Sequence, residues 1–226
     1  MKAIIVGATG LVGNELLHLI LEHVSFSHVK VFVRHKILLE HPKLEQIEID
    51  FNQLHNYAHE FNGDMVFCTL GTTINKAGSK DAFIQVDYTY PLQIASICAQ
   101  QNISQFHLVT AMGASSSSNI FYNKVKGNIE EAIQKLTLET FVVYRPSMLL
   151  GNRKENRVGE KIGQILMTSL DFMFVGWLKK YKAIQAKDVA KAMIIQSLKN
   201  KKGFHVIESD KILEIANYYI ATNNKN

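Results

Sequence analysis

The amino-acid sequence predicts an α/β fold, a doubly wound parallel sheet with a small C-terminal elaboration. An apolar run at residues 3–6 is followed by three glycines spaced three apart and then by a helical pattern at 15–21. Strand, glycine turn and helix in this order begin a βαβ unit. Further short apolar runs alternate with segments of helical length along most of the 226 residues, without a linker or a repeat. This alternation predicts one parallel sheet with crossover helices.

Five more strands are expected in the first two thirds of the chain, at 29–33, 47–51, 65–70, 106–110 and 141–144. Helices are expected between them, at 54–61, 82–101 and 121–136. The second helix should bend near Pro91, because proline lacks the backbone donor, and residues 75–80 should form a loop. Beyond Gly151 the pattern weakens, with helices expected at 158–168, 188–198 and 212–221 and a short strand at 204–207.

Composition is that of a globular protein, with 47% hydrophobic and 20% charged residues and a formal net charge of +5. The basic residues are scattered, so a solvated surface is expected and a nucleic-acid partner is not. Cys68 and Cys98 lie in apolar segments without a disulfide pattern, which favours a reducing compartment. His55 and His59 have metal-ligand spacing but no evident third ligand, so no metal site is expected.

No signal peptide is expected, because the N-terminus enters a strand directly. No apolar run approaches the ~18 residues of a transmembrane segment. These features together predict a cytoplasmic protein. Residues 170–178 are nevertheless strongly apolar and precede a group of lysines. They suit an interfacial membrane helix, but a segment closing a substrate pocket is favoured. We expect residues 151–185 to form that segment within a single domain, 1–226.

The glycine turn predicts a site for the pyrophosphate of a dinucleotide, the alternative being a turn that binds nothing. Gly7 would permit the tight turn, Gly10 would let backbone N–H groups approach the phosphates, and Gly13 would let the helix pack closely. The helix N-terminus adds free N–H donors and a partial positive charge. The expected cofactor contacts in this segment are Gly7, Thr9, Gly10, Leu11, Val12 and Gly13.

The end of the second strand bears on which dinucleotide binds. An acidic residue there would bind the 2′-hydroxyl of NAD, whereas Arg34 offers a planar fork to the 2′-phosphate of NADP. NADP(H) is therefore favoured over NAD(H), the alternative being a solvated basic turn. At the next strand end Asp50, beside Phe51, could accept from the adenine amino group, although a plain strand-end aspartate fits almost as well. Contacts to adenosine are also expected from the turn after the fourth strand, at Leu70, Gly71 and Thr72.

Tyr122 and Lys126 stand four residues apart on the expected helix 121–136, which places both side chains on one face. A tyrosine hydroxyl is a weak acid at neutral pH, and a neighbouring ammonium stabilises its phenolate. Such a hydroxyl can exchange a proton with a substrate oxygen while a nicotinamide supplies hydride. Lys126 can also hydrogen-bond the nicotinamide ribose. The pair predicts reduction of a carbonyl or oxidation of an alcohol.

Several motifs are distributed over residues 1–170. They are the glycine motif 7–13, Leu70-Gly71-Thr72-Thr73 with Lys76-Ala77-Gly78, Tyr122 with Lys126-Gly127, Arg145-Pro146 with Leu149-Leu150, and 152–157. In this combination the chain resembles an atypical short-chain dehydrogenase/reductase, and more narrowly the Tat-interacting-protein-type subgroup with an extended-type glycine motif. The resemblance implies NADP(H) binding, with Pro146 among the cofactor contacts, Tyr122 as general acid/base and Lys126 as its partner.

Two positions depart from the family pattern. The family's catalytic serine should follow the fifth strand, where this chain has Thr110. Thr110 or a serine at 115–118 must therefore take the role of that serine. The asparagine of the family's proton relay is matched by Asp87. We therefore expect an NADP(H)-dependent oxidoreductase with a small, lipophilic substrate. The alternative is an NADP(H)-binding regulatory protein with a protein partner and little turnover.

Overall fold

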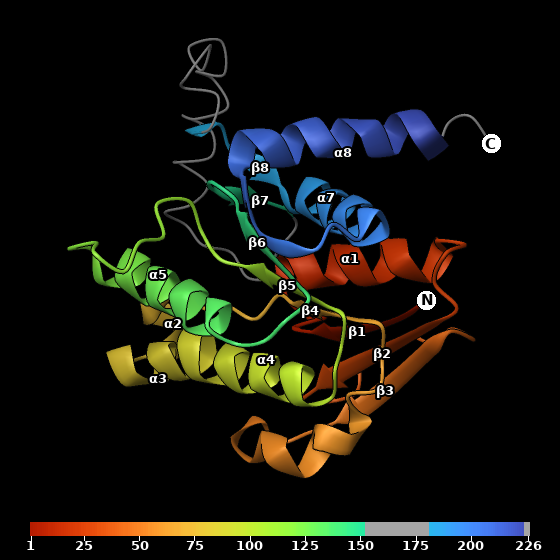
Figure 1. The fold of residues 1–226 in the computed structure, drawn as a ribbon, viewed down its shortest axis with the longest axis horizontal. Coiled ribbons are helices and arrows are strands. Elements are labelled where there is room, and N and C mark those ends of the chain that lie inside the picture. Colours follow the sequence, from red (N-terminus) through yellow and green to blue (C-terminus); the bar gives the residue numbers. More distant parts are fainter. Residues whose placement is uncertain (152–180, 224–226) are drawn as a thin grey trace.

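A computed structural model of the chain describes residues 1–151 and 181–223, with side chains described up to residue 219. In these ranges seven parallel strands form one sheet in the order β3-β2-β1-β4-β5-β6-β9 (Figure 1). The strands are β1 (Lys2–Val6), β2 (His28–Val33), β3 (Leu44–Glu48), β4 (Met65–Cys68), β5 (Gln105–Val109), β6 (Thr140–Arg145) and β9 (Gly203–Glu208). The expected doubly wound parallel sheet is confirmed. The expected helix at 158–168 and the apolar segment 170–178 lie outside the described residues.

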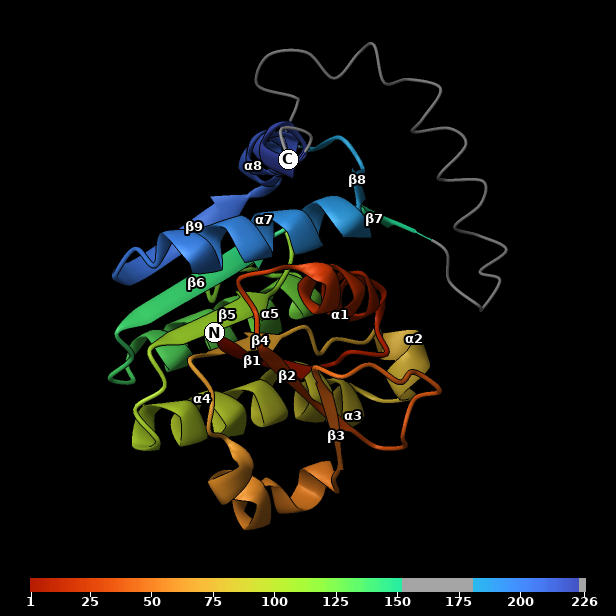
Figure 2. The same ribbon diagram turned by 90° about the vertical axis from the view of Figure 1, so that its right-hand side faces the viewer.

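Helices cover both faces of the sheet, as the two perpendicular views show (Figures 1 and 2). One face carries α1 (Leu11–Glu22) and α7 (Ala186–Lys199), with α8 (Ser209–Asn223) packed on α7. The other face carries α4 (Tyr90–Gln100) and α5 (Phe121–Gln134). Two short strands, β7 (Leu149–Leu150) and β8 (Ile184–Gln185), pair with each other beside the sheet.

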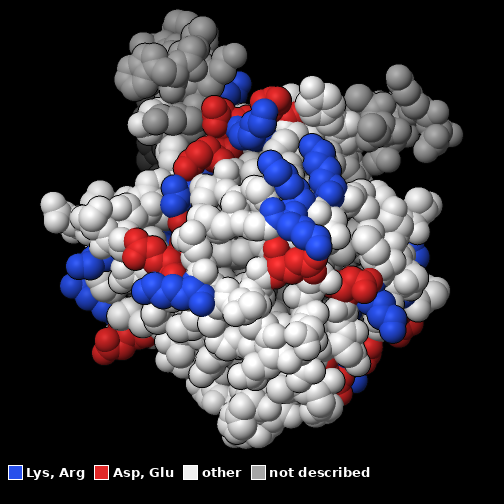
Figure 3. Space-filling view, in the orientation of Figure 1, with Lys and Arg blue, Asp and Glu red and all other residues white. Residues whose placement is uncertain are grey.

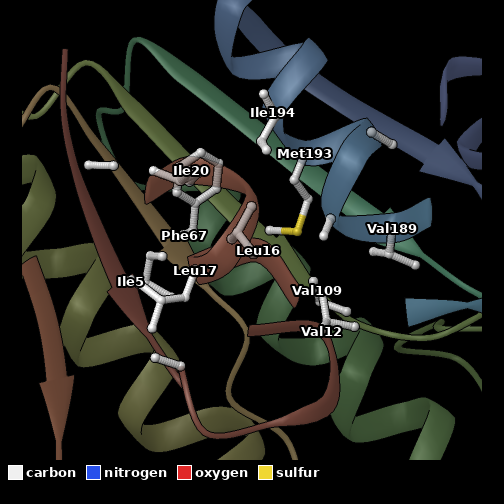
Figure 4. Packing of buried hydrophobic residues seen from close by; sticks show 14 of the residues in the cluster. Ile5, Val12, Leu16, Leu17, Ile20, Phe67, Val109, Val189, Met193 and Ile194 are labelled. Carbon is white, nitrogen blue, oxygen red and sulfur yellow. The ribbon is translucent and has the colours of Figure 1, made fainter. Parts of the chain in front are cut away.

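Alternation along the strands divides the core between the two faces, because successive side chains of a strand point to opposite sides. On the α1 face, Ile5 and Phe67 meet Leu16 and Leu17 of α1, and Met193 of α7 closes the layer (Figure 4). Each fully buried side chain of this size contributes about 1.5–3 kcal/mol by leaving water. The opposite faces of the same strands pack against α4 and α5. This second layer includes Val6, Cys68, Leu108, Ile94 and Ile129.

A polar chain runs through the α1 face of the core. His107 on β5 is fully buried, with Nδ1 3.0 Å from the Tyr144 hydroxyl and Nε2 3.0 Å from Gln105 Oε1. The Gln105 amide donates in turn to the Ser197 carbonyl of α7 at 3.2 Å. Burial lowers the pKa of His107 to about 3, so the imidazole is neutral at physiological pH.

The segment before α4 differs from the expected single helix over 82–101. It is divided into α3 (Lys80–Ile84), a π-helix η2 (Gln85–Thr89) and α4. Pro91 occupies the first turn of α4, where a missing N–H breaks no helical hydrogen bond. The expected single helix is thus interrupted by a π-helix that precedes Pro91. The expected loop at 75–80 instead includes a short helix, α2 (Ile74–Ala77), because Thr73 caps its N-terminus.

The third strand occupies 44–48 rather than the expected 47–51. Asp50 accepts a hydrogen bond from the backbone N–H of Asn52 at 2.9 Å and thereby starts a 3₁₀-helix, η1 (Phe51–Glu60). Phe51 turns into the core as part of that helix. The strand therefore ends before the apolar residues that extended the sequence pattern.

Basic and acidic side chains are interspersed on the face shown in Figure 3. Ion pairs at the surface of the molecule include Lys202 with Glu139 at 2.6 Å and Lys211 with Glu214 at 2.7 Å. None of the helices within the described ranges combines the length and apolarity that a bilayer crossing requires.

Candidate functional site

The strand order reverses between β1 and β4, and the loops that follow these two strands lie against each other. Thr69, after β4, donates both its backbone N–H and its hydroxyl to the Val6 carbonyl, at 2.8 and 3.1 Å. Gly7 adopts a φ of +96°, and a Cβ there would lie 2.8 Å from the Thr69 carbonyl carbon. In doubly wound sheets, ligands bind in the crevice beyond the carboxyl ends of the strands at such a reversal.

The N-terminus of α1 lies directly after the Gly7 turn, at this reversal, and has no side-chain cap. Gly10 is the N-cap residue, is exposed and uses its own N–H to bind the Gly7 carbonyl at 2.9 Å. The first helical hydrogen bond runs from Asn14 to Gly10, so the N–H groups of Leu11, Val12 and Gly13 have no acceptor within the helix. These donors and the helix dipole fit an anionic pyrophosphate.

Gly10 and Gly13 have different surroundings. A Cβ at Gly13 would lie 2.2 Å from the Gly7 carbonyl oxygen, so this glycine permits the close contact of helix and turn. At Gly10 the φ of −78° suits any residue, and the nearest atom to a Cβ would be 3.2 Å away. Thr9 is exposed and Leu11 is half-buried, with its methyl group 2.7 Å from where a Cβ of Gly151 would lie.

The residues expected on the adenosine side lie at the carboxyl ends of neighbouring strands. Arg34 follows β2, is exposed, and forms no ion pair with any side chain in the described ranges. Asp50 caps η1 with one carboxylate oxygen, and the ring of Phe51 packs 5.4 Å from that of Tyr90. The buried Phe51 ring is thus committed to the core.

The loop after β4 lies at the same reversal of strand order. Leu70 packs against the second core layer, and Gly71 is exposed. The backbone N–H of Thr72 donates to Asp87 Oδ2 at 2.9 Å.

Tyr122 and Lys126 lie one turn apart on α5, beside this loop. The Lys126 ammonium is 2.7 Å from Asp87 Oδ1 and 6.0 Å from the centre of the Tyr122 ring. A Cβ at Gly71 would lie 3.6 Å from Asp87 Oδ1 and 3.8 Å from Lys126 Nζ, so the ion pair directly adjoins the loop. The Tyr122 ring also packs against Phe83, 5.5 Å between centres.

The ion pair is buried, with side-chain exposures of 4% for Lys126 and none for Asp87. Burial by itself lowers the pKa of Lys126, but the charge of Asp87 and the neighbouring Tyr122 and Cys68 raise it above its ordinary value. Burial raises the pKa of the Cys68 thiol to about 12, so that thiol is uncharged. Lys126 is a permanent cation balanced by Asp87. Among the described residues its ammonium donates to Asp87 Oδ1, and its remaining N–H groups can serve a ligand.

Thr110 follows β5 as expected, and its hydroxyl donates to Glu130 Oε1 at 2.6 Å. Glu130 is buried on α5, one turn beyond Lys126, and holds the guanidinium of Arg145 through both carboxylate oxygens. Arg145 also donates to Glu208 at 3.0 Å. The proton of Thr110 is therefore held by an internal carboxylate.

The serines at 115–118 bond locally. Ser115 and Ser117 hydroxyls lie 2.9 Å apart, and Ser116 donates to Glu131. The loop packs so closely on α5 that a Cβ at Gly127 would collide with the backbone of Ser115. The chain after β6 also contacts the segment between β5 and α5, because the carbonyl of the buried Pro146 accepts from the N–H of Met112 at 2.9 Å.

Sequence reasoning did not single out Thr69 or Glu130. Thr69 follows an apolar strand directly, and its position across from Gly7 depends on strand order. Glu130 falls at helical spacing after Tyr122 and Lys126, which was an available signal, but a glutamate on an amphipathic helix is usually solvated. Within the described ranges no three His, Cys, Asp or Glu side chains are grouped to hold a metal ion.

Comparisons with known proteins agree with this geometry. A model of an NAD(P)H-binding family matches residues 7–201. Protein HTATIP2 of Rattus norvegicus is 34% identical over 93% of this chain and 87% of its own length. The mitochondrial protein FMP52 of Coccidioides immitis is 29% identical over 88% of this chain and 86% of its own length. The Bordetella bronchiseptica enzyme WbmH, solved in complex with NAD⁺, has the same fold, with a TM-score of 0.70 at 16% identity over 99% of this chain and 80% of its own.

These relatives correct one expectation. The sequence predicted a cytoplasmic protein, but the fungal relatives, including those of Eremothecium gossypii and Candida albicans, are named as mitochondrial proteins.

The family itself follows from the length of the match. The NAD(P)H-binding model spans most of the chain, and HTATIP2 exceeds 30% identity over nearly its whole length. The chain belongs to the NAD(P)H-binding Rossmann-fold family, as an atypical short-chain dehydrogenase/reductase of the Tat-interacting-protein type.

Proposed function

We propose that the protein is an NADP(H)-dependent oxidoreductase that reduces a carbonyl or oxidises an alcohol. The observation that carries the proposal is the tyrosine–lysine pair on α5, with Lys126 held as a buried cation beside the loop after β4. A structural role alone would not require a lysine at a buried position, because burying a charge is costly unless it is paired.

The cofactor would lie across the crevice between β1 and β4. The free N–H groups of residues 11–13 would bind its pyrophosphate, and Gly10 leaves room for the phosphates to approach. Arg34 supports the preference for NADP(H), because an exposed guanidinium at this strand end can hold a 2′-phosphate with two hydrogen bonds. The bound nicotinamide would supply hydride chemistry.

Tyr122 would hold and move the proton. In the direction of reduction its hydroxyl donates to the substrate oxygen, and in the direction of oxidation the phenolate accepts. Lys126 would bind the ribose with its free N–H groups and stabilise the phenolate by charge. The Thr110 hydroxyl, which donates to Glu130, can offer a substrate only its lone pairs in this arrangement.

A second candidate function is an NADP(H)-binding regulatory protein with little turnover. It is favoured by the same Thr110 contact, since a hydroxyl committed to Glu130 does not polarise a substrate carbonyl. The relatives HTATIP2 and FMP52 carry names that state no reaction. The mitochondrial naming of the FMP52 relatives supports a mitochondrial location for this protein too.

The substrate is proposed to be a small molecule. Structural neighbours include MoeE5, solved with UDP-glucose and NAD. The expectation of a lipophilic substrate rested on residues 170–178, which lie outside the described ranges.

The test is cofactor binding followed by turnover. NADPH binding is measured by the change in nicotinamide fluorescence, and NADPH consumption is then followed over a panel of aldehydes, ketones and quinones. On a substrate that the wild type reduces, Tyr122→Phe should lower kcat by about 10²–10⁴-fold, with cofactor affinity nearly unchanged. Tyr57→Phe, on η1, is the matched control and should behave as the wild type.

Full activity in Tyr122→Phe would refute the assigned mechanism. NADPH binding without consumption across the whole panel would favour the regulatory protein.

A further inference from the structure

Asp87 contacts two parts of the site at once. Its Oδ1 lies 2.7 Å from the Lys126 ammonium of α5, and its Oδ2 accepts from the Thr72 N–H in the loop after β4 at 2.9 Å. Asp87 belongs to the π-helix η2, whose wider turn lies between α3 and α4. π-helical turns occur frequently at functional sites.

Few charged groups of the described residues act on Lys126. Among the described residues, the groups whose charge acts on Lys126 are Asp87 from η2, Tyr122 from α5 and Cys68 from β4. The Cys68 thiol is uncharged. Asp87 is therefore the carboxylate that balances Lys126, and both side chains are almost wholly removed from water.

We propose that Asp87 is a positioning residue, which keeps Lys126 charged and fixes its ammonium beneath the Gly71–Thr72 loop. The proposal rests on the proposed function only for what Lys126 then does, which is to hold the cofactor ribose. An asparagine at this position, as in the family pattern, would orient a lysine but would not balance its charge. Exchanging one carboxylate oxygen for an amide would leave a buried ammonium without a counter-ion.

The first experiment needs no cofactor. It compares melting temperatures of the wild type, Asp87→Asn, Lys126→Met and the double variant between pH 5 and pH 10. In Asp87→Asn the unpaired Lys126 releases its proton more readily in the folded protein than in the unfolded chain. The melting temperature of this variant should therefore approach that of the wild type as pH rises from 7 to 10.

In Lys126→Met the unpaired Asp87 takes up a proton more readily in the folded protein. The melting temperature of this variant should therefore approach that of the wild type as pH falls from 7 to 5. The double variant has no charge to balance, and its difference from the wild type should not depend on pH. Asp81→Asn, an exposed aspartate on α3, is the control and should track the wild type throughout.

The second experiment measures NADPH dissociation constants over pH 7 to 9.5. Asp87→Asn should bind NADPH progressively more weakly than the wild type as pH rises, by about threefold or more at the upper end, because Lys126 loses its charge. The wild type and Asp81→Asn should show no such divergence from each other.

The proposal would be overturned if the melting-temperature differences between the single variants and the wild type did not change with pH. A ratio of NADPH dissociation constants between Asp87→Asn and the wild type that stays constant with pH would also overturn it. If Asp87→Asn does not fold at pH 7, the double variant should fold, and its failure to do so would count against the proposal equally. A wild type that binds no NADPH would refute the proposed function, while the melting experiment would still decide the role of Asp87.

Discussion

Acid should destabilise this fold through His107. The imidazole is fully buried, and its pKa is lowered from 6.5 to about 3. In the unfolded chain it titrates near its ordinary value, so between these two values the unfolded state binds more protons than the folded state. The contribution of the neutral His107 to the free energy of unfolding is therefore fully present above pH 6.5, and it is lost as pH falls toward 3.

The size of this loss follows from the two pKa values. Each pH unit in the window corresponds to about 1.4 kcal/mol for one group. At pH 5 the loss from His107 is therefore about 2 kcal/mol. This should move the urea midpoint by about 1 M for a domain of this size.

The assay is urea unfolding at pH 7.5, 6 and 5, with His107→Gln as the comparison. A glutamine can replace the contacts to Tyr144 and Gln105 in part, but it does not titrate. Subtracting the two pH dependences removes contributions from other groups, such as His23, whose pKa is also lowered by burial and by Lys43. Equal pH dependences in the wild type and His107→Gln would refute the reasoning.

Three further outcomes concern the cofactor and the site. NADPH should bind more tightly than NADH, and Arg34→Ala should weaken NADPH binding by about tenfold or more while sparing NADH; titrations showing equal wild-type affinities would contradict this. Gly10→Val should abolish NADPH binding in a protein that still folds, as judged by circular dichroism. Gly13→Val should fail to fold, because its Cβ collides with the Gly7 carbonyl. Unchanged NADPH binding in folded Gly10→Val would show that this glycine serves only the turn. Thr110→Val should lower the free energy of unfolding by about 1–3 kcal/mol, since Glu130 loses a buried donor, and should lower kcat by less than Tyr122→Phe does; an equal loss of kcat would show that the hydroxyl acts directly.

Features of the site that depend on local spacing could be predicted from the sequence. The three glycines of the turn follow one another within seven residues. Tyr122 and Lys126 are four residues apart, and helix geometry alone places them on one face. The parallel sheet followed from alternation of strand and helix patterns. The end of β3 did not, because the capping contact of Asp50 competes with an apolar run that continues to Phe51.

Features that depend on long-range packing could not be predicted. The contact between Thr110 and Glu130 joins a strand end to a helix twenty residues away, and the sequence offers no sign that the hydroxyl turns inward. Likewise, His107 lies in a strand whose polar positions could equally face solvent. Its burial depends on Tyr144 and Gln105 supplying partners on the same face.

Two buried, oppositely charged residues of α5, Lys126 and Glu130, restrict how that helix can turn about its own axis. Lys126 is held by Asp87 from one neighbouring element, and Glu130, one turn later, is held by Arg145 from another. A rotation of α5 large enough to aim Tyr122 elsewhere would break both contacts. Since buried ion pairs add little net stability compared with apolar residues of the same volume, an engineer could replace both pairs and retain a stable fold. Without the two pairs, the rotation of α5 and hence the orientation of Tyr122 would be less well fixed. Screening for stability alone would therefore select sequences in which the Tyr122 hydroxyl no longer has a defined position.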